Sequence, residues 1–442
     1  MKSKIILTKN FRLKIVVFLI LITISHISNS FSQVYWNAIP SPVSKTLTKC
    51  FFINPSTGWI SGDSGTIIRT TNSGNNWTIQ NSGTFNNIED IFFLNERLGW
   101  ALTYQVFPDS NEFPGTEILT TTNGGNIWLS SMFPDTNMFM KTVYYMDSLR
   151  GFLGGISAAI VMTTNAGISW TYTDTDSNLV FVLPVFKIEF YDDFLGYACG
   201  GFRDIAGITW VTTNGGYNWK GTVLAPEPFF DLTILNSQKT ICAGGDLEYG
   251  SSIARTSDRG NSWFYDTLGV FGLATGIDNR TPSEIWMATS YAEKFIYSID
   301  TGITWSPVET PDNSAIFDLD FADTTYGFAC GVNGVILKYD RTKSSVINSN
   351  QELAERNFNL YQNYPNPFNP RTVIRYSLSE NQNTSLKIYD VLGNEVVSLV
   401  NEKQNSGSYN IEFDGTNLPS GIYFYKITSG KYSAVKRMVL IK

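Results

Sequence analysis

The sequence predicts an all-β protein, in which a seven-bladed β-propeller with four-stranded blades precedes a small C-terminal β-sandwich. Aromatic residues make up 14% of the 442 residues and charged residues only 16%, a composition that favours strands over coiled or disordered chain. An octet that ends in Trp recurs along the chain, at intervals close to the length of one propeller blade. Short apolar and glycine-rich segments fill each interval in a constant order.

The octet is represented by "TTNGGNIW", residues 121–128. Asn or Asp at its third position can cap a turn, Gly at its fifth position supplies a backbone conformation that other residues resist, and the Trp can fill the gap between neighbouring sheets. We therefore predict a structural turn between the third and fourth strands of each blade, without a chemical role. The residues at the third and last positions are Asn72 and Trp77, Asn123 and Trp128, Asn165 and Trp170, Asn214 and Trp219, Asp258 and Trp263, and Asp300 and Trp305.

The intervals between octets each contain the same series of strands. An apolar strand such as "IEDIFFL" comes first, a glycine-aromatic strand such as "LGWAL" second, and a third strand such as "TEILTTT" leads into the octet. After Trp305 three further strands follow without an octet, whereas "QVYWNAIP" near the N-terminus carries Trp36 one period before Trp77. We therefore expect residues 34–39 to pair with residues 334–339, which completes the last blade and closes a seven-bladed ring over residues 33–340.

The N-terminal segment has the pattern of a secretory signal peptide. Basic residues precede the apolar run "IVVFLILITI", which is too short for a stable membrane span, and small residues follow it. We predict a signal peptide over residues 1–32, with cleavage before Gln33, and no transmembrane span in the mature chain. The only histidine, His26, lies within this segment. A mature chain without histidine excludes Ser-His-Asp triads, Cys-His pairs and histidine-ligated metals, and we predict no catalytic residue, cofactor or metal.

Charge and cysteine content narrow the possible partners further. Residues 33–340 contain 15 Lys and Arg against 31 Asp and Glu, whereas residues 357–442 contain 9 against 6. The acidic segment 33–340 should repel nucleic acid, and no nucleic-acid partner is predicted. The four cysteines have no CxxC spacing, and they are better interpreted as buried small hydrophobic residues than as disulfides or metal ligands. They are Cys50, Cys199, Cys242 and Cys330.

The octets resemble the Asp-box (BNR) repeat, with Asn often in place of Asp. Together with the glycine-aromatic strands "LGWAL" and "RGFLGG", they are most similar to the photosystem II assembly factor-like propellers. The same box occurs in sialidases, xyloglucanases and sortilin-type receptors. The resemblance covers about 300 residues and implies the fold, but it leaves function open because the box is scaffold in all of these proteins.

The C-terminal part has a different composition. Residues 341–356 are polar and read as a linker, and residues 357–442 contain about seven short antiparallel strands of an Ig-like β-sandwich. "YPNPFNP" (364–370), "IYDVLGNEV" (388–396), "LPSGIYFYKI" (418–427) and the final "KRMVLIK" resemble the C-terminal sorting domain of type IX secretion cargo. The segment also resembles the Ig-like module of flagellar hook-capping proteins. The first resemblance implies the type IX secretion machinery as a partner and a secreted or outer-surface location in a Gram-negative bacterium.

Three functions remain open for the propeller. It could bind a protein or glycan, it could be a glycoside hydrolase of the sialidase-like or xyloglucanase-like kind, or it could be an assembly and interaction scaffold. The hydrolase is not favoured, because no Arg-Ile-Pro signature of sialidases is present and the xyloglucanase-like enzymes have two propellers rather than one. We therefore expect a binding protein rather than an enzyme.

A ligand is expected on the face opposite the octets. The loops between the second and third strands of a blade, and between the fourth strand and the next blade, share that face, and the insertions of this sequence concentrate there. Aromatic walls with a few polar groups suit peptide or sugar recognition. The candidate ligand-binding residues are Phe113, Glu117, Phe181, Arg203, Asp204, Phe230 and Tyr249.

Overall fold

The computed structural model describes residues 35–104, 115–156, 160–175, 183–342, 359–360, 363, 365–378, 380–391, 393–430 and 432–442. The chain forms two compact units, Met1–Lys343 and Ser344–Lys442. The predicted signal peptide and residues 343–356 of the predicted linker lie outside the described residues.

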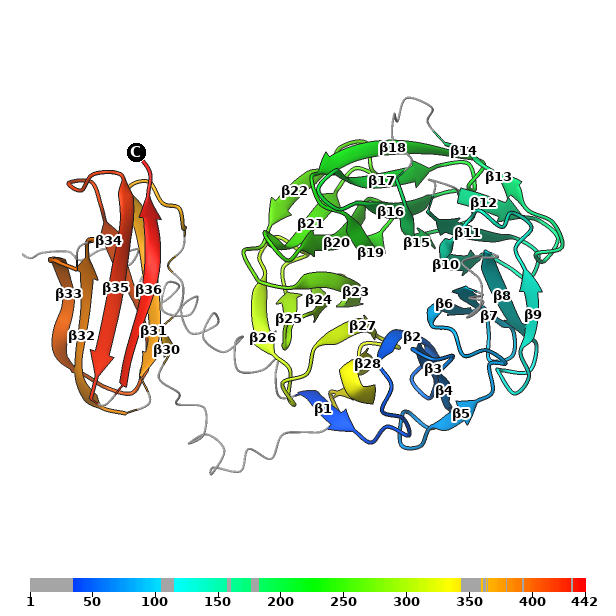
Figure 1. Cartoon of the computed structure of the whole chain (residues 1–442), viewed down its shortest axis with the longest axis horizontal. Helices are drawn as coiled ribbons and strands as arrows, with labels where there is room; N and C mark the ends of the chain where they lie inside the picture. Colours follow the sequence, from blue (N-terminus) through cyan, green and yellow to red (C-terminus); the bar gives the residue numbers. More distant parts are fainter. Residues whose placement is uncertain are drawn as a thin grey trace, which may run out of the picture. The chain divides into compact units, whose positions relative to one another are not determined.

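The first unit is a β-propeller, and its described strands form seven sheets around a central channel (Figure 1). The first three sheets are β2 (Leu47–Asn54), β3 (Thr57–Gly62), β4 (Ile67–Thr70) and β5 (Thr78–Gln80); β6 (Ile88–Phe93), β7 (Gly99–Tyr104), β8 (Thr116–Thr121) and β9 (Leu129–Met132); and β10 (Met140–Tyr145), β11 (Gly151–Gly155), β12 (Ile160–Thr163) and β13 (Thr171–Tyr172). The fourth sheet is β14 (Asp174–Thr175), β15 (Val185–Phe190), β16 (Gly196–Phe202), β17 (Ala206–Thr212) and β18 (Asn218–Ala225). The last three sheets are β19 (Phe229–Asn236), β20 (Lys239–Asp246), β21 (Gly250–Thr256) and β22 (Phe264–Thr267); β23 (Leu273–Thr281), β24 (Glu284–Ser290), β25 (Lys294–Ser298) and β26 (Ser306–Glu309); and β27 (Ile316–Asp320), β28 (Tyr326–Gly331) and β29 (Ile336–Asp340) with β1 (Trp36–Ile39).

The strand order places the start of each repeat at the centre. Strands β2, β6, β10, β15, β19, β23 and β27 each form the inner edge of a sheet, and each contacts the next in a closed cycle that returns from β27 to β2. The following strands lie progressively outward (Figure 1). A short 3-10 turn, Val332–Gly334, joins β28 to β29.

The ring is closed by the N-terminal strand. Strand β1 pairs antiparallel with β29, with Trp36 opposite Tyr339 and Ile39 opposite Ile336. Trp36 is buried and its ring lies 4.6 Å from that of Phe295 in the neighbouring sheet. The expected pairing of the two ends of the propeller is therefore present, and it hides the edge that β29 would otherwise expose.

The fourth sheet departs from the expected four strands. Strand β14 adds a fifth by pairing parallel with β18, with Asp174 opposite Asn218. The chain leaves β13 of the third sheet and runs along the outer edge of the fourth, where the N–H of Asp174 donates to the carbonyl of Tyr217 at 3.0 Å. The extra strand satisfies backbone groups of an otherwise open edge.

Stacked aromatic rings fill the spaces between sheets. Trp59 of β3 stacks on Phe93 of β6 with ring centroids 3.5 Å apart, and the octet Trp128 meets Phe93 edge-on at 5.8 Å. All three rings belong to one buried cluster shared by the first and second sheets. Equivalent stacks join Trp100 to Tyr145, Phe152 to Phe190 and Phe328 to Phe52.

The second unit consists of two antiparallel sheets over one core. Its strands are β30 (Asn359–Leu360), β31 (Arg371–Leu378), β32 (Gln382–Tyr389), β33 (Glu395–Gln404), β34 (Gly407–Asp414), β35 (Gly421–Ser429) and β36 (Tyr432–Leu440). The sheet orders are β30-β31-β34 and β33-β32-β35-β36. Ile374 and Phe413 from the smaller sheet share a buried cluster with Ile388 and Tyr425 from the larger one, as in a sandwich of two sheets.

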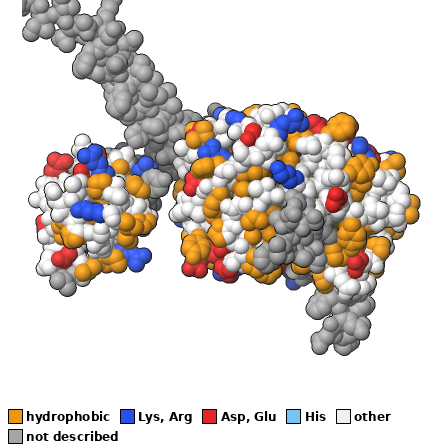
Figure 2. Space-filling view, turned by 90° about the horizontal axis from the view of Figure 1, so that it is seen from above, with side chains coloured by type: hydrophobic (Ala, Val, Ile, Leu, Met, Phe, Trp, Pro, Cys, Tyr) orange, Lys and Arg blue, Asp and Glu red, His pale blue; other side chains and the backbone are white. Residues whose placement is uncertain are grey.

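The described surface carries no single dominant patch on the face of Figure 2. Apolar, basic and acidic side chains are interspersed over the outer rim of the propeller in this view. Within the described residues, no helix has the length and apolar character needed to cross a membrane.

Candidate functional site at the mouth of the central channel

The polar side chains of the octet turns form hydrogen bonds within the turn itself. In the octet 121–128, the Thr121 hydroxyl donates to Asn123 Oδ1 at 3.0 Å and accepts the N–H groups of Asn123 at 3.3 Å and Gly125 at 2.9 Å. Asn123 Oδ1 also accepts the N–H of Ile127 at 2.9 Å. The same four bonds recur in each of the other five octets. Side chains that already hold a turn together have little left for a ligand.

Two positions of the octet were not singled out by sequence. The Thr or Ser at the first position supplies the hydroxyl at the centre of each turn. The fourth residue, like the Gly at the fifth, has a positive φ, even where it is Ser73, Ala166, Arg259 or Thr301. This second left-handed residue went unnoticed because its residue type varies, although its φ lies between 59° and 73° in all six octets.

The inner strands carry a second repeated feature, a β-bulge near the start of each. In β6, for example, Ile88 pairs with Thr103 and Asp90 with Leu102, so that Glu89 is the extra residue. All seven inner strands have this bulge, and the extra residue is half-buried in each. These seven residues line one hollow of about 240 Å³, together with Lys49. We call them the pore-mouth residues: Thr48, Glu89, Lys141, Phe186, Phe230, Thr275 and Phe317.

The pore mouth has an aromatic side and a charged side. Phe186 and Phe230 from adjacent sheets have ring centroids 5.6 Å apart, and Phe317 follows two sheets further round. On the other side, Lys141 Nζ lies 2.8 Å from Glu89 Oε2. The mouth can therefore hold an apolar group against the rings while polar groups of the same ligand face an ion pair.

Ionisable residues fill the channel just below the mouth. Six carboxylates and two lysines lie there. One ion pair among them joins Lys187 and Asp231, with Nζ 3.2 Å from Oδ1. The carboxylates also join neighbouring sheets, because Asp231 Oδ2 accepts the N–H of Ile277 at 3.0 Å and Asp90 Oδ2 that of Val143 at 2.9 Å. The carboxylates are Asp90, Glu189, Asp231, Asp278, Asp318 and Asp320, and the lysines are Lys49 and Lys187.

Burial in the channel shifts the pKa values of these groups. Burial raises the pKa of Glu189 to about 8, with Asp278 and Asp231 adding to the rise and Lys187 opposing it. Burial likewise raises the pKa of Asp318 to about 6, although Lys49 opposes it. Burial by itself lowers the pKa of Lys187, but the carboxylates around it, Asp231 first, bring it above its ordinary value. The carboxylates and lysines of the channel thus influence one another's pKa.

The structure places the expected ligand-binding residues in different surroundings. Phe113 and Phe181 lie outside the described residues. Phe230 is one of the pore-mouth residues. Glu117 lies on β8, the third strand outward, where its carboxylate accepts a hydrogen bond from Ser130 of β9, so it is remote from the inner strands.

The remaining three expected residues lie close together. Arg203 and Asp204 occupy the turn between β16 and β17, and exposed Tyr249 occupies the equivalent turn between β20 and β21. The N–H of Asp204 donates to Glu227 Oε2 at 3.3 Å, and Glu227 lies on the loop that leads into β19 and Phe230. These turns and the pore mouth therefore share one face of the propeller.

Sequence inspection missed most of the pore mouth. The bulges fall on the triplets "LTK", "IED", "MKT", "VFK", "FFD", "ATG" and "IFD", in each of which an apolar residue precedes the variable one. The bulges that give these triplets a common position are visible only in the strand pairing.

A wider hollow of about 380 Å³ lies along the outer edge of the fourth sheet, lined by Asp174, Thr213 and Asn214 among others. Its walls belong to the added strand β14 and to an octet turn whose polar atoms are already bonded. The pore mouth is the better candidate, because its side chains are not explained by the repeat.

Residues 362–442 match the family model described as the secretion system C-terminal sorting domain. The chain carries a secretion sorting domain. This domain belongs to the type IX system and indicates export to the cell surface or beyond. The second unit of the fold thus has an assigned role in export, and the candidate site lies in the other unit.

The propeller is similar to photosystem II assembly factors. The chloroplastic photosystem II stability/assembly factor HCF136 of Oryza sativa subsp. japonica is 27% identical over 207 residues, which cover 45% of this chain. The match spans only 40% of that relative's own length.

Solved structures of low identity share the propeller fold. YCF48 from Cyanidioschyzon merolae is 17% identical with a TM-score of 0.55, over 70% of this chain and 99% of that one. A structure described as YCF48 bound to D1 peptide is 20% identical with a TM-score of 0.54, over 69% and 97%. The GH74 xyloglucanase from Xanthomonas campestris is 12% identical with a TM-score of 0.53, over 77% of this chain and 59% of that one. At these identities the similarity establishes the fold alone.

Proposed function

We propose that this protein is an exported seven-bladed propeller that binds an extended segment of a protein partner at its pore mouth. The observation that carries the proposal is the set of seven equivalent bulges, which repeat in backbone but differ in side chain. The bulge has the same backbone position in every repeat, but its residue is Phe in three sheets, Thr in two, and Lys and Glu in one each. Because the fold does not fix the residue type here, the side chains can be selected for a ligand.

A polypeptide segment fits the chemistry of the mouth. Phe186, Phe230 and Phe317 offer apolar contact area at small cost in side-chain entropy, and such rings are typical of binding hot spots. The Glu89–Lys141 pair offers both a donor and an acceptor for backbone groups or for charged side chains. A related fold is described as bound to a peptide, which supports the choice of a peptide over a glycan.

Export would follow from the other parts of the chain. The predicted signal peptide would pass the chain across the inner membrane, and the sorting domain, which we regard as an Ig-like sandwich, would hand it to the type IX machinery. The propeller would then act at the outer surface or in the medium.

The test uses the exported chain on arrays of immobilised peptides and of glycans. We expect saturable binding to a subset of peptides and at least a tenfold loss of affinity in the double variant Phe230→Ala and Phe317→Ala. A matched control replaces two exposed rings on outer strands, Tyr172→Ala and Phe264→Ala, and should bind as the parent does. Unchanged peptide binding in the pore-mouth variant would disprove the proposal, and binding to glycans alone would replace the ligand class.

The glycoside hydrolase remains the competing function. Incubation of the same preparations with xyloglucan and with a sialoside should release no sugar. Turnover that disappears when a single carboxylate near the mouth, such as Glu227, is replaced by its amide would establish the hydrolase instead.

A further inference from the structure

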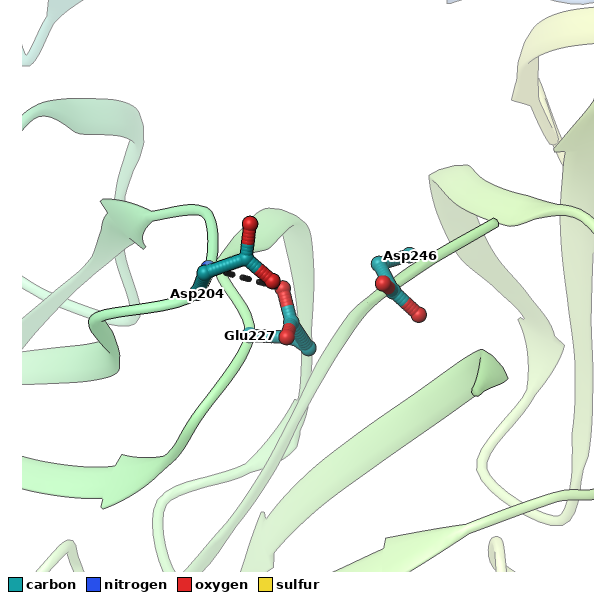
Figure 3. A group of neighbouring side chains, drawn as sticks. All are labelled: Asp204, Glu227 and Asp246. Atoms are coloured by element: carbon teal, nitrogen blue, oxygen red, sulfur yellow. Dashed lines mark hydrogen bonds between the residues drawn. The ribbon is translucent and has the colours of Figure 1, made fainter. Parts of the chain in front are cut away.

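Three carboxylates converge where the fourth and fifth sheets meet, on the face of the pore mouth. Asp204 comes from the turn between β16 and β17, Glu227 from the loop between β18 and β19, and Asp246 from the end of β20. One carboxylate oxygen from each residue lies within 4.8 Å of the corresponding oxygens of both others. Figure 3 shows these side chains arising from three separate segments, with Asp204 beside Glu227.

One oxygen of this group is buried without a hydrogen bond. Asp246 is 1% exposed, and its Oδ1 accepts the N–H groups of Glu248 and Tyr249 at 3.0 and 2.5 Å. Its Oδ2 has no hydrogen-bond donor among the described residues, and the Arg203 guanidinium is 4.0 Å away. A buried carboxylate oxygen without a donor costs more than an unmade neutral bond, so a further partner at this atom would be stabilising.

The local charge is unbalanced. Asp204 and Asp246 both have Arg203 as their nearest cation, at 3.7 and 4.0 Å, and the Arg203 side chain is 59% exposed. Glu227 is only 2% exposed. One weakly engaged guanidinium does not offset three carboxylates in so small a volume.

The propeller repeat does not require an acid at this position. The hairpin β16–β17 closes on the pair Phe202 and Ala206, and the hairpin β20–β21 closes on the pair Asp246 and Gly250, each with three residues between. Asp246 is therefore the counterpart of Phe202, which is exposed. The fourth sheet folds a turn of the same length without a carboxylate, so this turn does not require one, and the two bonds to Asp246 Oδ1 leave its Oδ2 unexplained.

We propose that Asp204, Glu227 and Asp246 form a binding site for a calcium ion, which ties the loops of two neighbouring sheets together. Oxygens bound to one calcium ion lie about 2.4 Å from it and hence no more than about 4.8 Å apart, and the three carboxylates meet this limit. A donor set of carboxylates without His or Cys suits a hard cation, and calcium accepts irregular geometry with water or carbonyl oxygens at its remaining positions.

Calcium at this site would act on the pore mouth. Glu227 lies three residues before Phe230 along the chain, at the start of β19. The ion would hold that loop against the turn that carries Asp204 and would fix where the chain enters the inner strand. Export would place the protein outside the cell, where calcium is abundant. The three carboxylates repel one another in the absence of the ion, and bound calcium would relieve this repulsion.

The probe is calcium itself, added to the exported chain after treatment with EDTA. We expect a saturable heat of binding at about one ion per chain, a dissociation constant on the order of 0.1–1 mM, and a rise in Tm of roughly 5 °C at about 10 mM calcium. Magnesium at the same concentration should give a smaller shift.

The variant Asp246→Asn keeps an oxygen for the turn but removes the charge. It should lose the calcium shift while melting in EDTA no lower than the parent, because the repulsion is relieved; a purely structural Asp246 would melt lower. Asp204→Asn, at an exposed residue whose φ of 60° suits Asn, is the second variant and should also lose the shift. Glu293→Gln, in the equivalent turn of the sixth sheet, is the control and should keep it. No shift in the parent, or an equal shift in parent and Asp246→Asn, would overturn the proposal.

Discussion

The octet turns and the pore mouth are both products of the same repeat, yet they differ in what the repeat preserves. Each octet turn keeps the residue types and the bonds together, from the Thr or Ser hydroxyl to the Asn or Asp oxygen. The pore mouth keeps only the backbone, a bulge in every inner strand, and changes the side chain from Glu89 to Lys141 to Phe186 between successive sheets. Uniform chemistry marks scaffold, and varied chemistry on a uniform backbone marks a place where a ligand can be accommodated.

The difference has an energetic counterpart. Octet side chains satisfy buried or half-buried backbone groups, so their loss leaves donors without partners. Pore-mouth side chains stand half-exposed on a backbone that pairs without them, so their loss should cost little folding energy. Substitutions in the two regions should therefore separate stability from binding.

The largest loss of stability is expected at an octet glycine. Gly216 has a φ of +86°, and a Cβ there would lie 2.3 Å from the ring of Phe152. Gly216→Ala combines left-handed strain with overpacking of a buried ring, and it should lower the free energy of unfolding by about 3 kcal/mol. Urea denaturation followed by Trp fluorescence measures this.

The control for this substitution is Gly269→Ala, which shares a positive φ of +64° but has no atom within 4 Å of its Cβ. It should lose only about 1 kcal/mol, from backbone strain alone. Equal losses in the two variants would mean that the octet is not packed as tightly against its neighbour as the ring stacking indicates.

A smaller loss is expected inside the channel, where Asp231 joins two sheets. Its carboxylate accepts the N–H groups of Leu232 and Ile277 and lies next to Lys187. Asp231→Ala leaves these groups without their partner and should cost about 2 kcal/mol. Asp266→Ala, an exposed acid of the same sheet, should be nearly neutral, and a similar loss in both would show that Asp231 contributes no specific bond.

The octet turns could be predicted from the sequence, whereas the pore mouth could not. The octet, the strand order and the pairing of Trp36 with the far end of the propeller were readable, because residue type and spacing repeat along the chain. The pore mouth could not be predicted in this way, because no single residue type is common to its seven members and they become neighbours only when the ring closes. Phe230 is one of the predicted ligand-binding residues, whereas Glu117, also predicted, lies on an outer strand.

The acidic group was also only partly visible in the sequence. Asp204 was named as a candidate, but Glu227 and Asp246 lie 23 and 42 residues further along, and nothing local brings them together. Their meeting depends on the angle between two adjacent sheets and on the loop before β19. The added strand β14 was missed for a similar reason, since two residues at a sheet edge leave no periodic pattern.

The next effect in size is a dependence of stability on pH, set by the channel. Because the pKa of Glu189 rises from 4.5 to about 8 on folding, the folded state retains a proton that the unfolded state releases between these values. The contribution of this group is therefore fully present below about pH 4.5 and is lost as the pH rises through about 8. Glu189→Gln should be more stable than the parent by about 1 kcal/mol at pH 8.5 and nearly equal to it at pH 5.

Denaturation curves from pH 5 to pH 8.5 measure the difference, with Glu293→Gln as an exposed control that should follow the parent at every pH. Curves of Glu189→Gln that run parallel to those of the parent would show that Glu189 is ionised in the folded channel.

The smallest effect on stability, and the sharpest contrast with Gly216, is expected at the pore mouth. Phe230 and Phe317 are the extra residues of their bulges, and β19 and β27 pair with their neighbours on either side of them. Replacing both by Ala removes half-exposed rings without opening a sealed core, so the free energy of unfolding should change by less than about 1 kcal/mol. The same variant should lose peptide binding, whereas Gly216→Ala, measured at a temperature where it is still folded, should keep it. A pore-mouth variant that unfolds as readily as Gly216→Ala would remove the distinction between the two regions, because its rings would then be part of the scaffold.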